Sequence, residues 1–232
     1  AVIKKNTKVL YVETPSNPLM LITDLEMVAR IAKERGIITM IDNTFASPVN
    51  QNPADYGMDI IIHSATKYMG GHSDICAGAV AASEKHIMQI WNLAKNIGGS
   101  LSDYTVWLLE RSIKTMALRV KAQNKNAMKL AKWLDKHALV ERVYYPGLKS
   151  HPDHKIAKKQ MRGYSGMLSF ELQPSLDAEV FMKSLKLIKQ SMSLAGVEST
   201  ILSPAKTSHA LLSLEERKRQ GIAEGLLRFS VG

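Results

Sequence analysis

The stretch HSATKYMGGHSD, residues 63–74, decides how the rest of the chain is interpreted. It follows an almost unbroken apolar run over residues 58–62, which predicts that a buried strand ends where a loop rich in hydroxyls and glycine begins. One lysine in this loop, Lys67, follows two hydroxyl-bearing residues, Ser64 and Thr66. A lysine amine can form a Schiff base and hydroxyls can donate hydrogen bonds to a phosphate. The loop therefore suits a phosphate-bearing aldehyde cofactor, although a lone lysine after a strand is most often a solvated surface group.

Length and composition bound the class of protein. The 232 residues allow one large domain or two small ones, and the hydrophobic share of 45% is enough for a core. No apolar run is long enough to cross a membrane. One cysteine, Cys76, excludes an internal disulfide and fits the reducing cytoplasm, and we expect it to be a small buried side chain. Strands are predicted close to both ends, so we expect the sequence to be a piece of a longer protein.

The formal net charge of +10 raises the alternative of a nucleic-acid-binding module. The lysines are scattered, however, and those at residues 121, 125, 129 and 132 recur at the spacing of one helical face. A solvated helix face explains them better. A nucleic-acid-binding module would predict strong, salt-dependent binding, but aromatic residues are few and no binding motif joins the charges, so no nucleic-acid partner is expected.

The first half of the chain predicts a mostly parallel sheet. Apolar runs at residues 8–13, 37–41, 58–62 and 77–82 read as strands, and a capping box from Thr23 to Glu26 begins a helix between the first two. Strand, helix and strand in this order predict a right-handed crossover between parallel strands. Asn17, Asp42 and Lys67 each lie just beyond a predicted strand. Since ligands of such sheets bind beyond the carboxyl ends of the strands, we expect these three residues to converge.

The second half predicts helices at about 84–97, at 103–137 with a break near residues 116–117, and at 175–186. Strands are predicted at residues 140–144, 167–172 and 226–231, and a capping box begins at Ser213. We therefore divide the chain into the remainder of a large domain, residues 1–116, and a smaller C-terminal α/β domain, residues 117–232.

Short motifs run through nearly the whole chain: ETPSNP (13–18), DNTFASP (42–48), SATKY (64–68), YPGL (145–148) with SHP (150–152), SL (193–194) with GVES (196–199), and LRFSVG (227–232). In these motifs and their order the chain resembles the Cys/Met metabolism (trans-sulfuration) family of pyridoxal-phosphate enzymes. The resemblance implies the α/β architecture of fold type I, like that of aspartate aminotransferase, with a mostly parallel sheet that is truncated here.

The resemblance implies pyridoxal 5′-phosphate as the cofactor and assigns roles around it. Lys67 matches the Schiff-base lysine, which also moves protons as a general acid and base. Asp42 matches the carboxylate that keeps the pyridine nitrogen protonated. Ser64 and Thr66 match phosphate ligands, and Asn17 matches a donor to the phenolic oxygen. The alternatives are local: Asn17 could shape a turn, and the hydroxyls could cap the loop.

On the substrate side, Arg228 matches the arginine that holds the α-carboxylate, for which a guanidinium fork is well suited. Ser193 and Glu198 match residues near the substrate, although Glu198 could instead be a structural acid. His151 and His154 look like a metal pair, but a site needs several converging ligands, so no metal is predicted.

The reaction that the resemblance favours is elimination or replacement on sulfur amino acids, of the cystathionine γ-synthase or γ-lyase type, in methionine biosynthesis or cysteine metabolism. Leu194 stands where β-lyases often carry tryptophan. Cystathionine β-lyase, methionine γ-lyase and O-acetylhomoserine sulfhydrylase stay as alternatives.

Family members also carry an N-terminal portion that has no counterpart here and that completes the phosphate site. We therefore expect this chain alone to be poorly active or inactive, and the resemblance implies a homotetramer. An alternative outside enzymology is a non-catalytic remnant that serves in assembly.

Overall fold

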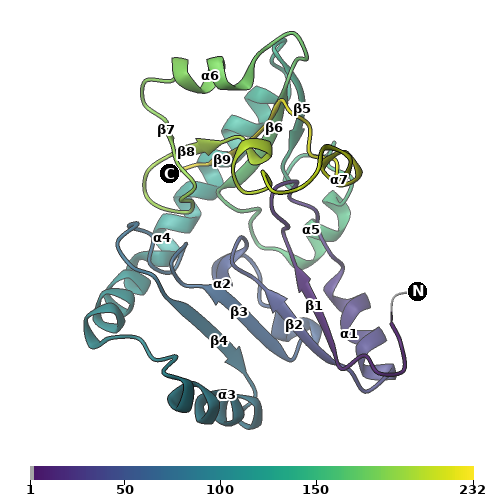
Figure 1. The fold of residues 1–232 in the computed structure, drawn as a ribbon, viewed down its shortest axis with the longest axis vertical. Coiled ribbons are helices and arrows are strands. Elements are labelled where there is room, and N and C mark those ends of the chain that lie inside the picture. The colour runs from purple at the N-terminus through teal and green to yellow at the C-terminus, as the bar shows by residue number, and fades with distance from the viewer. Residues whose placement is uncertain (1–2) are drawn as a thin grey trace.

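The computed structural model describes residues 3–232, which form two sheets joined by a long helix (Figure 1). The first sheet has the order β1-β2-β3-β4, with β1 at Val9–Glu13, β2 at Ile38–Asp42, β3 at Ile60–Ser64 and β4 at Gly78–Ala82. The first three strands are parallel and β4 is antiparallel to β3. The mostly parallel sheet predicted from the apolar runs is therefore confirmed.

The second sheet has the order β5-β6-β9-β8-β7 and lies in the upper half of Figure 1. Its strands are β5 (Val140–Tyr144), β6 (Met167–Leu172), β7 (Lys189–Gln190), β8 (Thr200–Leu202) and β9 (Leu226–Ser230). All pairs are antiparallel except β7 with β8. The three long strands were predicted, whereas the short β7 and β8 were not.

Helix α4, Asp103–Leu134, runs from the first sheet to the second. It is continuous, so the predicted break near residues 116–117 is wrong: the segment contains neither glycine nor proline, and nothing in it interrupts the hydrogen-bond ladder. Beyond that point α4 buries Val120, Ala127 and Ala131. The domain boundary at 116/117 falls inside this helix and stays a prediction.

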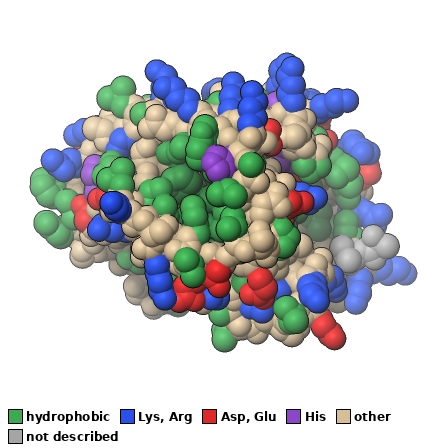
Figure 2. Space-filling view, turned by 90° about the horizontal axis from the view of Figure 1, so that it is seen from above, with side chains coloured by type: hydrophobic (Ala, Val, Ile, Leu, Met, Phe, Trp, Pro, Cys, Tyr) green, Lys and Arg blue, Asp and Glu red, His purple; other side chains and the backbone are tan. Residues whose placement is uncertain are grey.

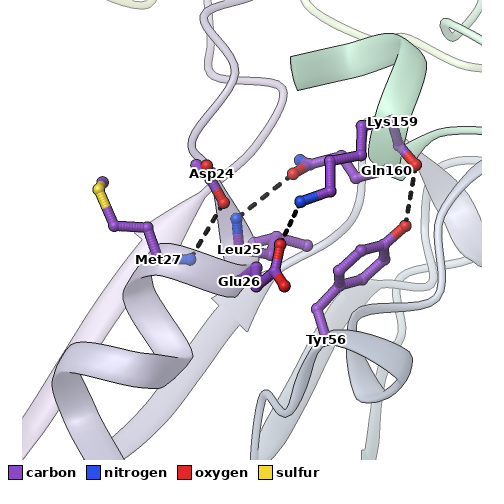
Figure 3. A network of polar contacts seen from close by, with 7 residues as sticks. All are labelled: Asp24, Leu25, Glu26, Met27, Tyr56, Lys159 and Gln160. Atoms are coloured by element: carbon purple, nitrogen blue, oxygen red, sulfur yellow. Dashed lines mark hydrogen bonds and ion pairs between the residues drawn. The ribbon is translucent and has the colours of Figure 1, made fainter. Parts of the chain in front are cut away.

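Helix α1, Leu25–Glu34, begins one residue later than the predicted capping box implies. Its N-cap is Asp24, whose carboxylate accepts a hydrogen bond from the backbone N–H of Met27 at 3.0 Å (Figure 3). The free N–H of Leu25 is bound by Gln160 of α5, His154–Gln160, at 3.3 Å. Lys159 also pairs with Glu26. Helix α5 of the second half thus caps α1 of the first half.

The remaining helices are short, apart from α3. They are α2 (Ser47–Asn50), α3 (Glu84–Ile97), α6 (Ala178–Ser184) and α7 (Leu214–Arg219), with 3-10 turns at Pro53–Tyr56 and Pro204–Lys206. Helix α6 is shorter than the predicted 175–186 because Asp177 caps its start. The predicted N-cap at Ser213 is confirmed, since its hydroxyl accepts from Glu216 N–H at 3.1 Å; the Glu216 carboxylate, which would complete a capping box, accepts from Arg219 and Gln220 instead.

The largest core lies between the second sheet and α4, where Leu168 of β6 is fully buried. Leu168→Ala should lower the free energy of unfolding by about 2–5 kcal/mol, because truncating a buried leucine loses both transfer energy and packing. Val180→Ala on α6 is the control, because that side chain is 67% exposed and should change stability by less than about 0.5 kcal/mol. Urea unfolding measures both, and equal effects would mean that this core is not the one described.

Several apolar surfaces stay open. A cavity of about 430 Å³ lies between the end of α4, the second sheet and α6, lined by Trp133, Phe181 and Phe229 among others. Seen from above, hydrophobic side chains surround a hollow in the surface (Figure 2). Helix α3 buries none of its side chains. Among the described residues, no helix has the length and apolar character needed to cross a membrane.

Candidate active site

The three parallel strands of the first sheet end at the same edge, with β3 extending two residues beyond β2. Asp42, the last residue of β2, is in register with Glu13 of β1 and with Ile62 of β3. The loop that carries Asn17 begins directly after Glu13, and the loop that carries Lys67 begins after Ser64, the last residue of β3. The predicted convergence at one sheet edge is therefore observed, while the chemical role of each residue stays a prediction.

Asp42 is fixed by a hydrogen-bonded loop. Its Oδ1 accepts from the N–H of Thr44 at 2.9 Å, and Thr44 Oγ1 accepts from the N–H of Ser64 at 2.8 Å. The neighbouring His63 is buried, which lowers the pKa of its imidazole, while the Asp42 charge acts in the opposite direction. The Asp42 carboxylate thus lies at the sheet edge and is linked through Thr44 to the start of the lysine loop.

Lys67 lies in a tight turn. Its N–H donates to Ser64 O at 3.1 Å, and its carbonyl accepts from Gly71 N–H at 2.7 Å. Partial burial and the positive charge of Arg228 lower the pKa of the Lys67 amine, and Cys76 opposes them. A lowered pKa raises the neutral, nucleophilic fraction of an amine. The prediction that Cys76 is buried is wrong, because its side chain is exposed beside the lysine loop.

The two predicted phosphate ligands differ. Thr66 Oγ1 donates to Ala77 O at 3.3 Å and accepts from Ala77 N–H at 2.9 Å, so this hydroxyl already caps the loop. Within residues 3–232 the Ser64 hydroxyl has no hydrogen-bond partner. Ser64 is therefore the freer donor of the two.

Arg228 of β9 is 5% exposed, and burial lowers the pKa of its guanidinium to about 10. The guanidinium donates to Asn17 Oδ1 at 3.3 Å and to Met192 O at 3.0 Å. Within the described part of the chain no carboxylate forms a salt bridge with it. A buried cation held only by neutral groups is an unpaired charge, which favours an anionic ligand.

Ser193 and Glu198 are placed differently. Ser193 Oγ lies 3.4 Å from Ser73 Oγ of the lysine loop, so it adjoins the site. Glu198 is exposed and makes no side-chain hydrogen bond to the described residues. The structure thus groups Asn17 with Arg228 and Ser193 with the lysine loop, and the Glu198 carboxylate lies beside Gly196, close to the Ser73 hydroxyl of the same loop.

Sequence reasoning missed two contributors. Glu13 Oε1 accepts from Asn17 N–H at 3.3 Å, and partial burial beside Asp42 raises the pKa of the Glu13 carboxyl. The sequence could have indicated Glu13, because this residue is the first of the motif that contains Asn17. Met192 contributes its backbone carbonyl to Arg228, which no side-chain pattern could have indicated.

This donor set fits a phosphate-bearing aldehyde. It offers an amine of lowered pKa, a free Ser64 hydroxyl, the Asp42 carboxylate and a buried guanidinium without an acidic partner. Among the described residues there is no group of three or more side chains arranged to hold a metal ion.

Comparison with known proteins agrees with this chemistry. A family model described as Cys/Met metabolism PLP-dependent enzyme matches residues 1–232. A cystathionine beta-lyase of Lactococcus lactis subsp. cremoris is 47% identical over 233 residues, covering 100% of this chain and 61% of the relative. A cystathionine gamma-lyase of Bacillus subtilis is 45% identical over 231 residues, covering 99% and 61%.

The crystal structure of cystathionine gamma-lyase from Lactobacillus plantarum complexed with L-serine superimposes with a TM-score of 0.97 at 43% identity, covering 100% of this chain and 61% of that one. The α/β fold class predicted from the sequence is thereby confirmed. The chain spans about 61% of the length of these relatives.

Proposed function

The chain belongs to the family of Cys/Met metabolism PLP-dependent enzymes, and on this premise we propose that the full-length protein eliminates or replaces side-chain groups of sulfur amino acids. The observation that carries the proposal is a lysine of lowered pKa, Lys67, on the same sheet edge as Asp42 and facing the charge of Arg228. Such a lysine is suited to hold an aldehyde cofactor.

Each residue of the cofactor side has one task in this proposal. Bound pyridoxal phosphate supplies an electron sink for charge that develops at the substrate α-carbon. Lys67 would hold the cofactor aldehyde, and its amine, when free, would move protons at the substrate α-carbon. Asp42 keeps the pyridine nitrogen protonated. Ser64 and Thr66 donate to the phosphate, and Thr66 must give up its bond to Ala77 O to do so.

The substrate side is anchored by Arg228, which binds the α-carboxylate of the amino acid with its two terminal nitrogens. Asn17 and the Met192 carbonyl hold the guanidinium in place. Asn17 also lies within reach of the sheet edge, which supports its role at the phenolic oxygen. Ser193 borders this site, and the Glu198 carboxylate lies close to Ser73 of the lysine loop, which supports a place near the substrate for both.

The type of reaction rests on fewer observations. Leu194, next to Ser193, is buried. A leucine at this position favours the γ-synthase or γ-lyase reaction over the β-lyase reaction, for which tryptophan is typical here. The relatives carry both β-lyase and γ-lyase names, so cystathionine β-lyase is the second candidate, ahead of methionine γ-lyase and O-acetylhomoserine sulfhydrylase.

A product assay separates these reactions. The full-length protein with pyridoxal phosphate and cystathionine should release 2-oxobutyrate, or should form cystathionine from cysteine and an activated homoserine ester. Pyruvate without 2-oxobutyrate or cystathionine synthesis would assign the β-lyase reaction instead. No turnover of any of these substrates by a cofactor-loaded full-length protein would contradict the proposed function.

We infer that the 232-residue chain alone is inactive and that the full-length protein is a cytoplasmic homotetramer, the state that the family resemblance implies. Helix α3 leaves Trp91, Leu93 and Ile97 exposed, which supports association. The same observation supports the alternative of a non-catalytic assembly role, in which the oligomer would form without binding pyridoxal phosphate. Light scattering with and without the cofactor distinguishes the two.

A further inference from the structure

The loops that carry the predicted site residues pack against one shared group of buried side chains. Buried residues follow several of the predicted site residues: Met20 comes three residues after Asn17, Phe45 three after Asp42, and Leu194 one after Ser193. They pack into a single buried group, which we call the floor cluster. Its members are Met20, Phe45, Tyr68, Val120, Met167, Leu194 and Ala195.

Tyr68, the residue next to Lys67, brings a hydroxyl into this cluster and links it by a hydrogen bond to Ser165. Its side chain is 2% exposed, and its hydroxyl lies 3.0 Å from Ser165 Oγ. Ser165 Oγ lies 2.6 Å from Phe45 O, to which it can only donate. The single Ser165 proton is therefore committed to Phe45, so Tyr68 must donate to Ser165 and accept from Gly166 N–H at 2.9 Å.

These hydrogen bonds form a chain, which we call the hydroxyl relay. It links the lysine loop to the Asp42 loop through the turn before β6. Every hydroxyl in it is satisfied, because Ser165 Oγ also accepts from Met167 N–H at 3.1 Å. Ser165 has a φ of +80°, a region that serine rarely adopts. A residue keeps such a backbone only where its surroundings over-determine it, and such positions cluster at functional sites.

Arg119 of α4 fixes the same loop from another direction. Its guanidinium donates to Tyr68 O at 2.9 Å and to Met69 O at 3.3 Å, the two carbonyls that follow Lys67. A Cβ on Gly71 would lie 1.9 Å from Arg119 Nη1, so only glycine leaves room for this contact. The backbone of the lysine loop is thus held by α4, and Tyr68 adds a second connection to the Asp42 loop beside the hydrogen bond from Ser64 N–H to Thr44 Oγ1.

We propose that Tyr68 and Ser165 are positioning residues whose hydroxyl relay holds the Lys67 amine at a fixed place relative to Asp42. The inference rests on the proposed role of Lys67 and extends it to residues that touch neither cofactor nor substrate. Arg228 lowers the pKa of the Lys67 amine and Cys76 raises it, and both effects depend on the loop keeping this position.

The structure provides a matched control. Tyr145 is fully buried and its hydroxyl donates to Ser165 O at 3.0 Å, so it binds the same residue through one hydrogen bond of the same length. It comes from the second half of the chain and makes no contact with the lysine loop through that hydroxyl. Tyr68→Phe removes two hydrogen bonds and Tyr145→Phe removes one, so both should lower the melting temperature, Tyr68→Phe by more, whereas only Tyr68→Phe should affect Lys67.

The test measures the Lys67 amine directly, without cofactor. Reductive methylation with formaldehyde and cyanoborohydride across a pH series, read by peptide mass spectrometry against the exposed Lys129, gives the pKa of Lys67. In the wild type we expect the pKa of Lys67 to lie below the ordinary value of a lysine. Tyr68→Phe, and Ser165→Ala at the other end of the relay, should move it back toward the ordinary value, while Tyr145→Phe should leave it unchanged.

A second readout is covalent attachment of pyridoxal phosphate, which Tyr68→Phe should slow by about tenfold, the size that one lost hydrogen bond of ordinary strength implies. An unchanged Lys67 pKa in Tyr68→Phe, or an equal shift in Tyr145→Phe, would overturn the inference. If Tyr68→Phe shifts the pKa of Lys67 but Lys67 takes up no pyridoxal phosphate even in the wild type, the positioning role is supported and the proposed function is contradicted.

Discussion

Lys67→Arg should reduce turnover by the full-length protein by at least about 10⁴-fold. General acid–base catalysis alone is worth about 10²–10⁴-fold, and the variant also loses the nucleophile, because the guanidinium of arginine stays protonated at any working pH. Arginine keeps the positive charge, so the loss cannot be attributed to charge removal. The measurement is kcat at saturating substrate, with bound pyridoxal phosphate quantified in each preparation.

Lys129→Arg on the exposed face of α4 is the control and should retain wild-type turnover. If Lys67→Arg kept more than about one hundredth of the wild-type kcat, another lysine would have to carry the reaction, because acid–base work by itself accounts for at least that factor.

Arg228→Ala should raise the KM for the amino-acid substrate by about 10²–10³-fold. Removing one partner of a buried ion pair costs about 3–5 kcal/mol, and each 1.4 kcal/mol is a factor of about ten in affinity. The guanidinium is buried and has no acidic partner within residues 3–232, so its charge is available to neutralise a substrate carboxylate. The exposed Arg142→Ala is the control.

An analogue without the α-carboxylate separates carboxylate binding from a general loss of structure. It should bind the wild type and Arg228→Ala equally weakly. The pKa of the Lys67 amine should also rise in Arg228→Ala, because the charge of Arg228 helps to lower it. Tighter binding of the carboxylate-free analogue by the wild type than by Arg228→Ala would show that Arg228 acts on something other than the carboxylate.

Local sequence signals predicted the strands and their common edge, because parallel strands that are buried on both faces read as continuous apolar runs. Local signals also explain the errors. Both Thr23 and Asp24 can cap a helix, and the structure uses Asp24. Residues 116–117 contain no helix breaker, and α4 continues through them. Cys76 gave no indication of its exposure.

Contacts between distant segments could not be predicted from the residues alone. Arg228 and Asn17 are 211 residues apart, and only the family resemblance placed both at the site. The Tyr68–Ser165 relay joins a loop of the first sheet to a turn before the second, and isolated hydroxyls carry no periodicity that could indicate such a pair. Glu198 was proposed from its motif alone; it makes no side-chain hydrogen bond to the described residues, and its role stays a prediction.

The most direct test of the central claim is the site of covalent attachment of pyridoxal phosphate. The cofactor is added to the protein, the visible absorption spectrum is recorded, the bond is fixed with borohydride, and the labelled peptide is mapped. The account predicts a visible absorption band and a single label on Lys67. A label on any other lysine, with Lys67 unmodified, would contradict it.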